Sequence, residues 1–477
     1  MMIESYPFYL AGKPIHRDEK LKVLCKARGE LVAEVSLATG EDLLDALNAG
    51  SSHAAEATLP AWRRQEILIE LSRAIADCRE DFAQALCLEA GKPIRDARVE
   101  VDRAVETFRV AGEEAVRMSG EWMPLEYSPA SEGMQGLIRR FPAGLCAQIT
   151  PFNFPLNLAA HKIGPAIAVG NPFILKPASS TPITALMLGE VLSTFDLPEG
   201  MFSILPLKRM EAERLASDAR VKHLSFTGSP EVGWRLKANS GRAKVSLELG
   251  GNAACVVDAD TNLDFAADRI TTGAFYQSGQ SCISVQRVFV HADIYEDLRD
   301  RLVSKARGLK AGEPMEEDTY LGPLITEADA ERVKSWIDEA VDGGATLLCG
   351  GERKGPWVNA SWLEDVPKEL SLSCREVFGP VAILEPYTDF KSVIARVNDS
   401  DFGLQAGIFT KNLDRAHYAF EHCEVGGVII GDIPSLRVDA MPYGGVKDSG
   451  EGREGLRFAM EEMSDSRIML MRGVGRL

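Results

Sequence analysis

The sequence predicts an α/β protein with two parallel-sheet domains and a small β arm. Its 477 residues exceed the size at which one hydrophobic core stops growing, so at least two domains are expected. Short apolar runs alternate with helical segments in two separate stretches of the chain, which is typical of doubly wound parallel sheets. Two further strand-like segments lie outside these stretches, and they could form an arm.

A helical region is expected over residues 41–117, before the first sheet. Apolar side chains recur there at helical spacing, and residues 100–117 form one long amphipathic run. The spacing is clearest at Trp62, Ile67, Leu68, Leu71 and Ile75. We expect a helical lead-in to the first sheet.

The first alternating stretch starts at Leu145. Strands are expected at 145–150, 172–176, 202–206, 221–227 and 244–249. Helices are expected between them near 157–169, 181–194, 209–217 and 230–239. This repeated order of strand and helix implies a parallel, doubly wound sheet.

The second alternating stretch runs from Ala253 to about residue 435 and predicts a second α/β domain. Its strands are expected at 254–258, 285–291, 346–348, 381–385, 406–410 and 427–430. The arm would combine the polar, Pro/Gly-punctuated stretch 120–141 with the short apolar strand 466–473. Frayed termini and a surface hairpin are the alternative for these two segments.

Composition narrows the class of protein. The 53 basic and 70 acidic residues give a net charge of −17, and no basic run occurs, so we expect no nucleic-acid partner and no anionic membrane surface. The longest uncharged stretch, 141–160, contains Pro142, Pro151 and Pro155, which argues against a membrane span. The N-terminus lacks a secretory signal pattern, so we expect a cytoplasmic location.

Nine widely spaced cysteines without a C-x-x-C pair disfavour both a zinc site and a disulfide framework. Most of these thiols lie in apolar stretches and are expected to be buried in the core. Cys282 differs, because Gly279 and small polar residues precede it between a helical segment and the strand 285–291. Such a turn can expose the sulfur and its backbone N–H to a cleft, although a structural role remains open.

Glu248 is a candidate general base. Leucines flank it at the end of a strand, and Gly250 and Gly251 follow. Burying a charge there is costly unless the group is used or paired, and the expected rise in pKa suits a group that takes a proton from water. A carboxylate that caps a backbone amide is the alternative.

Asn153 is a candidate oxyanion donor. It lies in the sequence Pro151-Phe-Asn-Phe-Pro155, where a strand end enters a turn stiffened by two prolines. A rigidly held amide can stabilise a developing negative charge. Ordinary turn chemistry is the alternative reading of this asparagine.

Taken together, these segments resemble the aldehyde dehydrogenase superfamily, and the segments 107–114 and 437–443 look most like its lactaldehyde-type and related uncharacterised branch. The matching motifs, in the order of that family, are Pro-Phe-Asn-Phe-Pro at 151–155, Phe-Thr-Gly-Ser at 226–229, Leu-Glu-Leu-Gly-Gly at 247–251, Gly-Gln-Ser-Cys at 279–282 and Glu-Val-Phe-Gly-Pro at 376–380. Five compatible motifs are a specific match. The resemblance covers nearly the whole chain.

The resemblance implies the aldehyde dehydrogenase fold. It consists of a Rossmann-like cofactor domain over 1–117 and 138–247, a catalytic α/β domain over 248–455 and an oligomerisation arm over 118–137 and 456–477. A homodimer or homotetramer is implied, with no metal. Oxidation of an aldehyde to its acid would use Cys282 as nucleophile, Asn153 and the Cys282 amide as oxyanion donors, and Glu248 to activate water for thioester hydrolysis.

The resemblance also implies an NAD or NADP cofactor. The residues implied to contact it are Ile149, Lys176, Ser179, Gly228, Ser229, Val232, Leu249, Glu376 and Phe378. Relatives that prefer NAD often carry glutamate where Ser179 stands, and a carboxylate there would repel a 2′-phosphate. With Lys208 and Arg209 in a nearby loop, NADP is expected to be accepted, unless both basic residues are merely solvated.

The substrate is expected to be a short hydroxy- or anionic aldehyde such as lactaldehyde. Arg109 and Arg437 could anchor its tail, with Arg103 and Ile283 as further candidates, although either anchor could instead be a salt-bridged structural residue. Relatives that oxidise phosphorylated aldehydes tend to have arginine before the nucleophile, where this chain has Ser281. A cofactor-independent thiol esterase and a non-catalytic dinucleotide-binding protein remain the alternatives.

Overall fold

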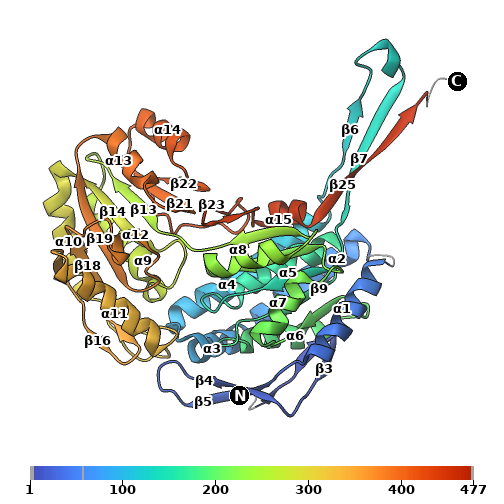
Figure 1. Cartoon of the computed structure of the whole chain (residues 1–477), viewed down its shortest axis with the longest axis horizontal. Helices are drawn as coiled ribbons and strands as arrows, with labels where there is room; N and C mark the ends of the chain where they lie inside the picture. The colour runs from blue at the N-terminus through green and yellow to red at the C-terminus, as the bar shows by residue number, and fades with distance from the viewer. Residues whose placement is uncertain (1–4, 56–58, 474–477) are drawn as a thin grey trace.

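Two large sheets and a projecting three-stranded arm organise the chain in a computed structural model, which describes residues 5–55 and 59–473 (Figure 1). Residues 1–4 and 474–477, at the ends of the expected first domain and arm, lie outside the described ranges. No helix within the described ranges is long and apolar enough to cross a membrane.

The first sheet has eight strands in the order β24-β12-β11-β8-β9-β10-β2-β3. Its five central strands are parallel: β8 (Cys146–Ile149), β9 (Phe173–Lys176), β10 (Phe202–Ile204), β11 (His223–Thr227) and β12 (Lys244–Glu248). The helices that connect them are α5 (Asn157–Val169), α6 (Ile183–Ser193), α7 (Arg209–Ser217) and α8 (Pro230–Asn239). All these elements were predicted, and α5 is buried along its whole length, which explains its near-continuous apolar sequence.

The edges of this sheet were not predicted. An N-terminal hairpin, β2 (Phe8–Leu10) and β3 (Lys13–Ile15), joins antiparallel to β10 at one edge. At the other edge β24 (Gly450–Glu451) pairs with β12. Late residues of the chain therefore lie beside Glu248. These edge strands are too short to show a periodicity in the sequence.

The second sheet has seven strands in the order β15-β18-β19-β14-β13-β21-β22. Their bounds are β13 (Ala253–Val257), β14 (Val285–His291), β15 (Thr346–Cys349), β18 (Ser361–Glu364), β19 (Val381–Tyr387), β21 (Gln405–Phe409) and β22 (Gly427–Ile430). Only β15 is antiparallel, and β18 was not predicted. The helices of this unit are α9 (Leu263–Phe275), α10 (Tyr295–Arg307), α11 (Glu327–Asp342), α12 (Ser371–Cys374), α13 (Phe390–Asn398) and α14 (Leu413–His422).

The helical lead-in forms α1 (Gly40–Ala55), α2 (Ala61–Asp77), α3 (Arg79–Ala90) and α4 (Ile94–Ala115). Four of its five marker side chains are fully buried, whereas Trp62 is exposed at the start of α2. The remaining strands form small sheets: β1 (Ser5–Tyr6), β4 (Lys20–Leu24) and β5 (Leu31–Ser36) in one, β16 (Arg353–Lys354) with β17 (Trp357–Val358), and β20 (Phe402–Gly403) with β23 (Val446–Lys447).

The arm consists of β6 (Glu121–Pro124), β7 (Met134–Pro142) and β25 (Ser464–Arg472), and it projects away from both sheets (Figure 1). β25 pairs antiparallel with β7 over nine residue pairs, from Ser464 opposite Pro142 to Arg472 opposite Met134. The stretches 120–141 and 466–473, which the sequence placed outside both sheets, therefore pair with each other. Helix α15 (Leu456–Glu462), just before β25, packs on α5 and α4 of the first domain.

Candidate active site

A cavity of about 700 Å³ contains the residues that the sequence marks as chemically important. We call it the reaction cavity. Loops that follow strands of both large sheets line it, as do side chains of α4 and α11. Cys282, Glu248 and Asn153 all lie in its wall, so the fold brings together three side chains that are far apart in the sequence.

Cys282 is presented by an unusual turn. Gln277, Ser278 and Gly279 have φ angles of 51°, 56° and 69°, three successive residues in the left-handed region that L side chains rarely adopt. A Cβ atom on Gly279 would lie 2.1 Å from the carbonyl oxygen of Gly379, so only glycine fits there. Backbone strain of this kind is typical of sites whose geometry is imposed by function.

The Cys282 sulfur lies 3.1 Å from the hydroxyl of Tyr443. Burial raises the pKa of this thiol to about 12, while the tyrosine hydrogen bond acts in the opposite direction. The carboxyl groups of Glu376 and Glu248 are close enough to raise the pKa further, and Arg437 opposes them. Nothing in the sequence indicated this contact between Tyr443 and the sulfur.

Asn153 is fixed by the turn that carries the cysteine. Its Nδ2 donates to the carbonyl oxygen of Gln280 at 3.0 Å, and its own carbonyl oxygen accepts from Gln277 Nε2. The amide therefore keeps one N–H that is not used in this hydrogen bond, on a side chain that lines the reaction cavity.

Glu248 is buried at the end of β12, and neither of its carboxylate oxygens has a hydrogen-bond partner among the described residues. Burial raises the pKa of this carboxyl well above its usual value, and the nearby Glu454 raises it further. The expected rise in pKa is therefore present, whereas the alternative role as a cap of a backbone amide has no support in these contacts.

A cluster of buried charges lies beside Glu248 and was not recognised in the sequence. Its buried members are His161, Lys162, Arg437, Asp439 and Glu454, and the partly exposed Arg103 pairs with Asp439 at its edge. Lys162 Nζ lies 3.1 Å from Glu454 Oε1, and Arg437 Nη2 lies 3.1 Å from Glu454 Oε2. Burial would raise the pKa of Glu454, but Lys162 and Arg437 hold it below its usual value.

The two arginines proposed as substrate anchors differ in position. Arg437 lines the reaction cavity, its guanidinium lies 3.8 Å from the ring centroid of Tyr443, and its buried Nε has no hydrogen-bond partner among the described residues. Arg109 is not among the lining residues, because it lies on the outer side of α4 and pairs with Glu106 and Glu113 of the same helix. The structure corrects the placement of Arg109, and Arg103 takes its place in the cavity wall.

One side of the reaction cavity suits a dinucleotide. Gly228, Ser229 and Pro230 lie in its wall at the N-terminus of α8, where unpaired backbone N–H groups favour anions. A Cβ atom on Gly233 would lie 2.4 Å from Leu249 Cδ2, so α8 packs closely on the end of β12. The residues present fit a bound phosphate.

Glu376 and Phe378 lie at the other end of this side. Glu376 Oε1 accepts from the backbone N–H of Gly251 at 3.0 Å, and burial raises the pKa of this carboxyl to about 7. Phe378 has a φ of 48° and makes an edge contact with Phe152, with ring centroids 5.7 Å apart. Both side chains line the reaction cavity.

The remaining cofactor candidates lie along the carboxyl edge of the first sheet, outside the lining of the cavity. Ile149 and Lys176 end β8 and β9, Ser179 is exposed three residues further, and Val232 lies in α8. No described residue pairs with the Lys176 ammonium, and burial lowers the pKa of this group to about 8. Such a lysine can bind hydroxyl or phosphate oxygens of a ligand.

Lys208 and Arg209 are less suited to that role. Lys208 pairs with Glu19 at 2.6 Å, and Arg209 pairs with Glu213 at 3.3 Å, both on the surface. This arrangement supports the alternative that the two basic residues are solvated. Within the described ranges, no group of three or more His, Cys, Asp or Glu side chains is arranged to hold a metal ion.

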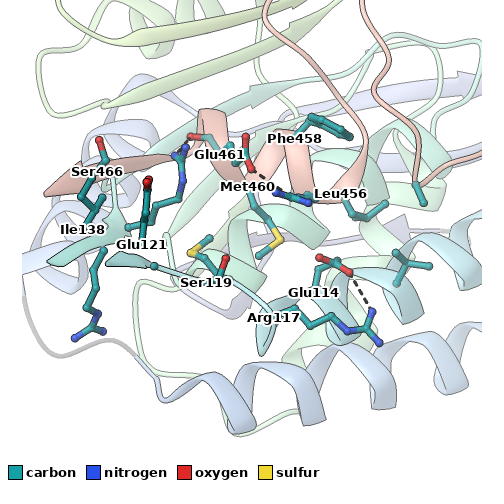
Figure 2. Close-up of a pocket in the computed structure, with 17 residues that line it drawn as sticks. Glu114, Arg117, Ser119, Glu121, Ile138, Leu456, Phe458, Met460, Glu461 and Ser466 are labelled. Atoms are coloured by element: carbon teal, nitrogen blue, oxygen red, sulfur yellow. Dashed lines mark hydrogen bonds and ion pairs between the residues drawn. The ribbon is translucent and has the colours of Figure 1, made fainter. Parts of the chain in front are cut away.

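A second cavity, of about 800 Å³, lies where the arm joins the body, and we call it the root cavity (Figure 2). It lies between the end of α4, β6, β7 and α15. Two of its arginines are paired locally: Arg117 with Glu114 at 3.1 Å, and Arg457 with Glu461 at 3.3 Å. It contains no cysteine, so it offers no thiol nucleophile.

Fold and site together define a dinucleotide-binding α/β enzyme with a buried thiol and a buried carboxyl group in one cavity. Comparison with known proteins identifies the family. A sequence model of the aldehyde dehydrogenase family matches residues 15–469. The chain belongs to this family and is an NAD(P)-dependent aldehyde dehydrogenase.

Individual relatives match over nearly their full length. The chain is 42% identical to a 3-sulfolactaldehyde dehydrogenase of Priestia aryabhattai over 470 residues, which cover 98% of each chain. The crystal structure of aldehyde dehydrogenase 21 from Physcomitrella patens, in complex with the reaction product succinate, matches with a TM-score of 0.98 and 48% identity over 100% of both chains.

A third match carries a cofactor. The glyceraldehyde-3-phosphate dehydrogenase GapN of Methanocaldococcus jannaschii, complexed with NADP, has a TM-score of 0.91 and 34% identity, covering 96% of this chain and 100% of that one. The predicted fold class is confirmed by these full-length matches.

Proposed function

We propose that this enzyme oxidises a short aldehyde bearing a second, anionic group to the corresponding acid, using NADP or NAD. In this proposal Cys282 is the nucleophile, Asn153 stabilises the oxyanion and Glu248 activates water. The presence of Arg103 and Arg437 in the same cavity wall as Cys282 supports the anionic substrate.

The residues supply the steps in turn. The thiolate of Cys282 forms a bond to the aldehyde carbon, and the free N–H of Asn153 and the backbone N–H of Cys282 stabilise the negative oxygen. A bound nicotinamide would supply the hydride acceptor, and loss of hydride from the carbon bonded to Cys282 would leave a thioester on this residue. Glu248 takes a proton from water as the water attacks this thioester, which releases the acid and restores the thiolate.

The raised pKa of Glu248 suits this role, because a carboxylate in an apolar pocket is a stronger base than one in water. In this proposal the residues that hold the cofactor are Ile149, Lys176, Ser179, Gly228, Ser229, Val232, Leu249, Glu376 and Phe378.

The balance of buried charge favours an anionic substrate. Arg103, Arg437 and Lys162 are cations, whereas Asp439 and Glu454 are the carboxylates with lowered pKa beside them. Burial lowers the pKa of His161 and raises that of Glu248, which favours the neutral form of both groups. The Nε of Arg437 lies 3.7 Å from Asp439 Oδ1 but has no hydrogen-bond partner among the described residues, so it can donate to an anion.

The named relatives agree with this chemistry. A sulfonate is part of 3-sulfolactaldehyde, and succinate carries a second carboxylate. Lactaldehyde, which the sequence led us to expect, lacks this second anionic group. In this proposal it is a poorer substrate than an anionic aldehyde of the same kind. Ser281 before the nucleophile still counts against a phosphate-bearing aldehyde.

A pair of aldehydes of equal length tests the proposal. The kcat/KM for 4-oxobutanoate should exceed that for butanal by tenfold or more, a factor that about 1.4 kcal/mol of charge-assisted hydrogen bonding provides. Arg103→Gln and Arg437→Gln should each lower this ratio, while Arg109→Gln, on the outer side of α4, should retain it. Equal kcat/KM values for the two aldehydes in the wild type would contradict an anionic substrate.

Two other functions are distinguished by the cofactor. A thiol esterase would hydrolyse activated esters through Cys282 and Glu248 at the same rate with or without NADP. It would not reduce the cofactor. A non-catalytic protein would bind NADP but oxidise no aldehyde. Growth of the reduced-nicotinamide absorbance with an aldehyde substrate excludes both as the main function.

We further infer that the arm docks on a second copy of the chain, giving a homodimer or homotetramer. Trp122, Ile468 and Leu470 are more than half exposed on it, with exposed fractions of 55%, 51% and 57%. Its outer strand β25 also offers a free sheet edge. Ile468→Glu with Leu470→Glu should lower the mass measured by light scattering, whereas Met210→Glu, on the exposed face of α7, should not.

A further inference from the structure

The hydroxyl of Tyr443 is the one described hydrogen-bonding group on the Cys282 sulfur, at 3.1 Å. Tyr443 is buried, with 3% of its surface exposed. Its backbone is held firmly, because its N–H donates to the carbonyl of Glu454 at 3.1 Å and its own carbonyl accepts from the N–H of Glu454 at 2.7 Å. Burial and these two backbone hydrogen bonds therefore hold the hydroxyl in place.

Arg437 supports this tyrosine from the face of its ring. The guanidinium carbon lies 3.8 Å from the ring centroid, and the side chain is fixed by Glu454. A cation over an aromatic face draws electron density out of the ring, so the phenolic O–H becomes a better donor. Arg437 thus connects the buried charge cluster to the atom that touches the sulfur.

The sulfur needs such a donor. Glu248, at the end of β12, and Glu376, in the loop after α12, both act against a negative charge on Cys282, and only Arg437 and Tyr443 act in its favour. Burial and the neighbouring thiol keep the pKa of Tyr443 well above its usual value, so the phenol retains its proton while the thiol ionises. A protonated phenol can donate to a thiolate.

We propose that Tyr443 is a catalytic residue, whose hydroxyl donates a hydrogen bond to the Cys282 thiolate and stabilises it before attack on the aldehyde. Arg437 is the positioning residue that holds the ring and strengthens the donor. Tyr443 makes and breaks no covalent bond. Its hydrogen bond to the sulfur is lost as the carbon–sulfur bond forms. The inference rests on the proposed role of Cys282 as nucleophile.

Alkylation of Cys282 by iodoacetamide tests the inference without any substrate. Its rate is followed against pH by mass spectrometry of the Cys282 peptide, which separates it from the exposed Cys78 and Cys374. Because only the thiolate reacts, Tyr443→Phe should slow alkylation about tenfold near neutral pH and move the apparent pKa up by about one unit. The substitution removes one oxygen and keeps the ring, so the fold should be retained.

A matched control exists elsewhere in the chain. Tyr320 also carries an arginine over its ring, with the guanidinium of Arg95 3.7 Å from the centroid, but it does not line the reaction cavity. Tyr320→Phe should leave the alkylation profile of Cys282 unchanged. Arg437→Gln should shift the profile in the same direction as Tyr443→Phe, and the double variant should shift it further, because the Arg437 charge also acts on the sulfur directly.

An unchanged or lower apparent pKa in Tyr443→Phe overturns the inference, because the hydroxyl would then do no more than fill space. Failure of the proposed nucleophile would look different. In that case the fully alkylated enzyme would still oxidise aldehydes, whatever the pH profile of alkylation. The two results are read from separate measurements, so they cannot be confused.

Discussion

The reaction cavity and the root cavity are similar in volume, about 700 and 800 Å³, and both are lined by charged side chains. They differ in how those charges are satisfied. In the reaction cavity both oxygens of Glu248 and the Nε of Arg437 are buried without a hydrogen-bond partner among the described residues. In the root cavity Arg117 and Arg457 pair with carboxylates, and Arg140 donates to the carbonyl oxygen of Glu461 (Figure 2).

The difference shows where the fold tolerates an energetic cost. An unpaired buried polar group costs roughly 1–3 kcal/mol, and natural structures retain few of them. Three such atoms, on Glu248 and Arg437, belong to the wall of the cavity that holds the strained cysteine turn, where the pKa values of Glu248 and Cys282 are both raised. The root cavity has charge without strain or unmet hydrogen bonds, which fits a contact surface better than a site of chemistry.

The largest effect should come from the thiol of the reaction cavity. Cys282→Ala should lower kcat for aldehyde oxidation by at least about a thousandfold, because no other nucleophile replaces the sulfur. The rate is measured by the reduced-nicotinamide absorbance. Cys78→Ala removes an exposed thiol far from the cavity and should keep the wild-type rate. Substantial activity in Cys282→Ala would remove the chemical distinction between the two cavities.

Glu248→Gln should lower steady-state turnover about 10²- to 10³-fold while leaving the first turnover fast. Hydride transfer precedes the step that needs the base, so rapid mixing should show a burst of about one reduced cofactor per subunit. If burst and steady state fall equally, Glu248 acts before hydride transfer and the proposed order of steps is wrong.

The raised pKa of Glu248 also sets a pH dependence. In the folded protein this carboxyl is protonated to a higher pH than a free glutamate, so the active carboxylate becomes populated only as pH rises. Thioester hydrolysis should accelerate with pH through that raised pKa, and the acceleration should vanish in Glu248→Gln. A rate independent of pH in the wild type would contradict a base at this position.

A smaller effect is expected at the cofactor edge. Ser179→Glu should raise KM for NADP about tenfold and leave KM for NAD nearly unchanged, because a carboxylate there repels only the 2′-phosphate. Steady-state kinetics with both cofactors measure this. Lys208→Ala should change neither value more than about twofold, since Lys208 is already paired with Glu19. A large loss of NADP affinity in Lys208→Ala would restore that lysine as a phosphate ligand.

The sequence predicted the central strands of both sheets because their apolar runs are continuous and separated by clear helical periods. It also selected Cys282, Glu248 and Asn153, since each stands at a strand end or turn beside glycine or proline. Strands of two or three residues, such as β2 and β24, carry no periodicity of their own, and only tertiary pairing defines them.

The buried charge cluster was missed for another reason. Lys162 and Glu454 are 292 positions apart, and each looks like an ordinary charged residue in its own segment. The signal for Lys162 was its place in a helix that is otherwise apolar, where a lysine must find a partner. Arg109 was misplaced because helical spacing alone did not reveal which face of α4 turns toward the cavity.

The smallest effect should come from the root cavity. Arg457 pairs with Glu461 one helical turn away, and its side chain is 69% exposed, so the pair is screened by water. Arg457→Ala should therefore change the free energy of unfolding, measured by denaturant titration, by less than about 0.5 kcal/mol and leave kcat unchanged. A fall in kcat would mean that the root cavity communicates with the reaction cavity through α4, which lines both. A lower mass in light scattering with normal kcat would instead place Arg457 in the contact between copies.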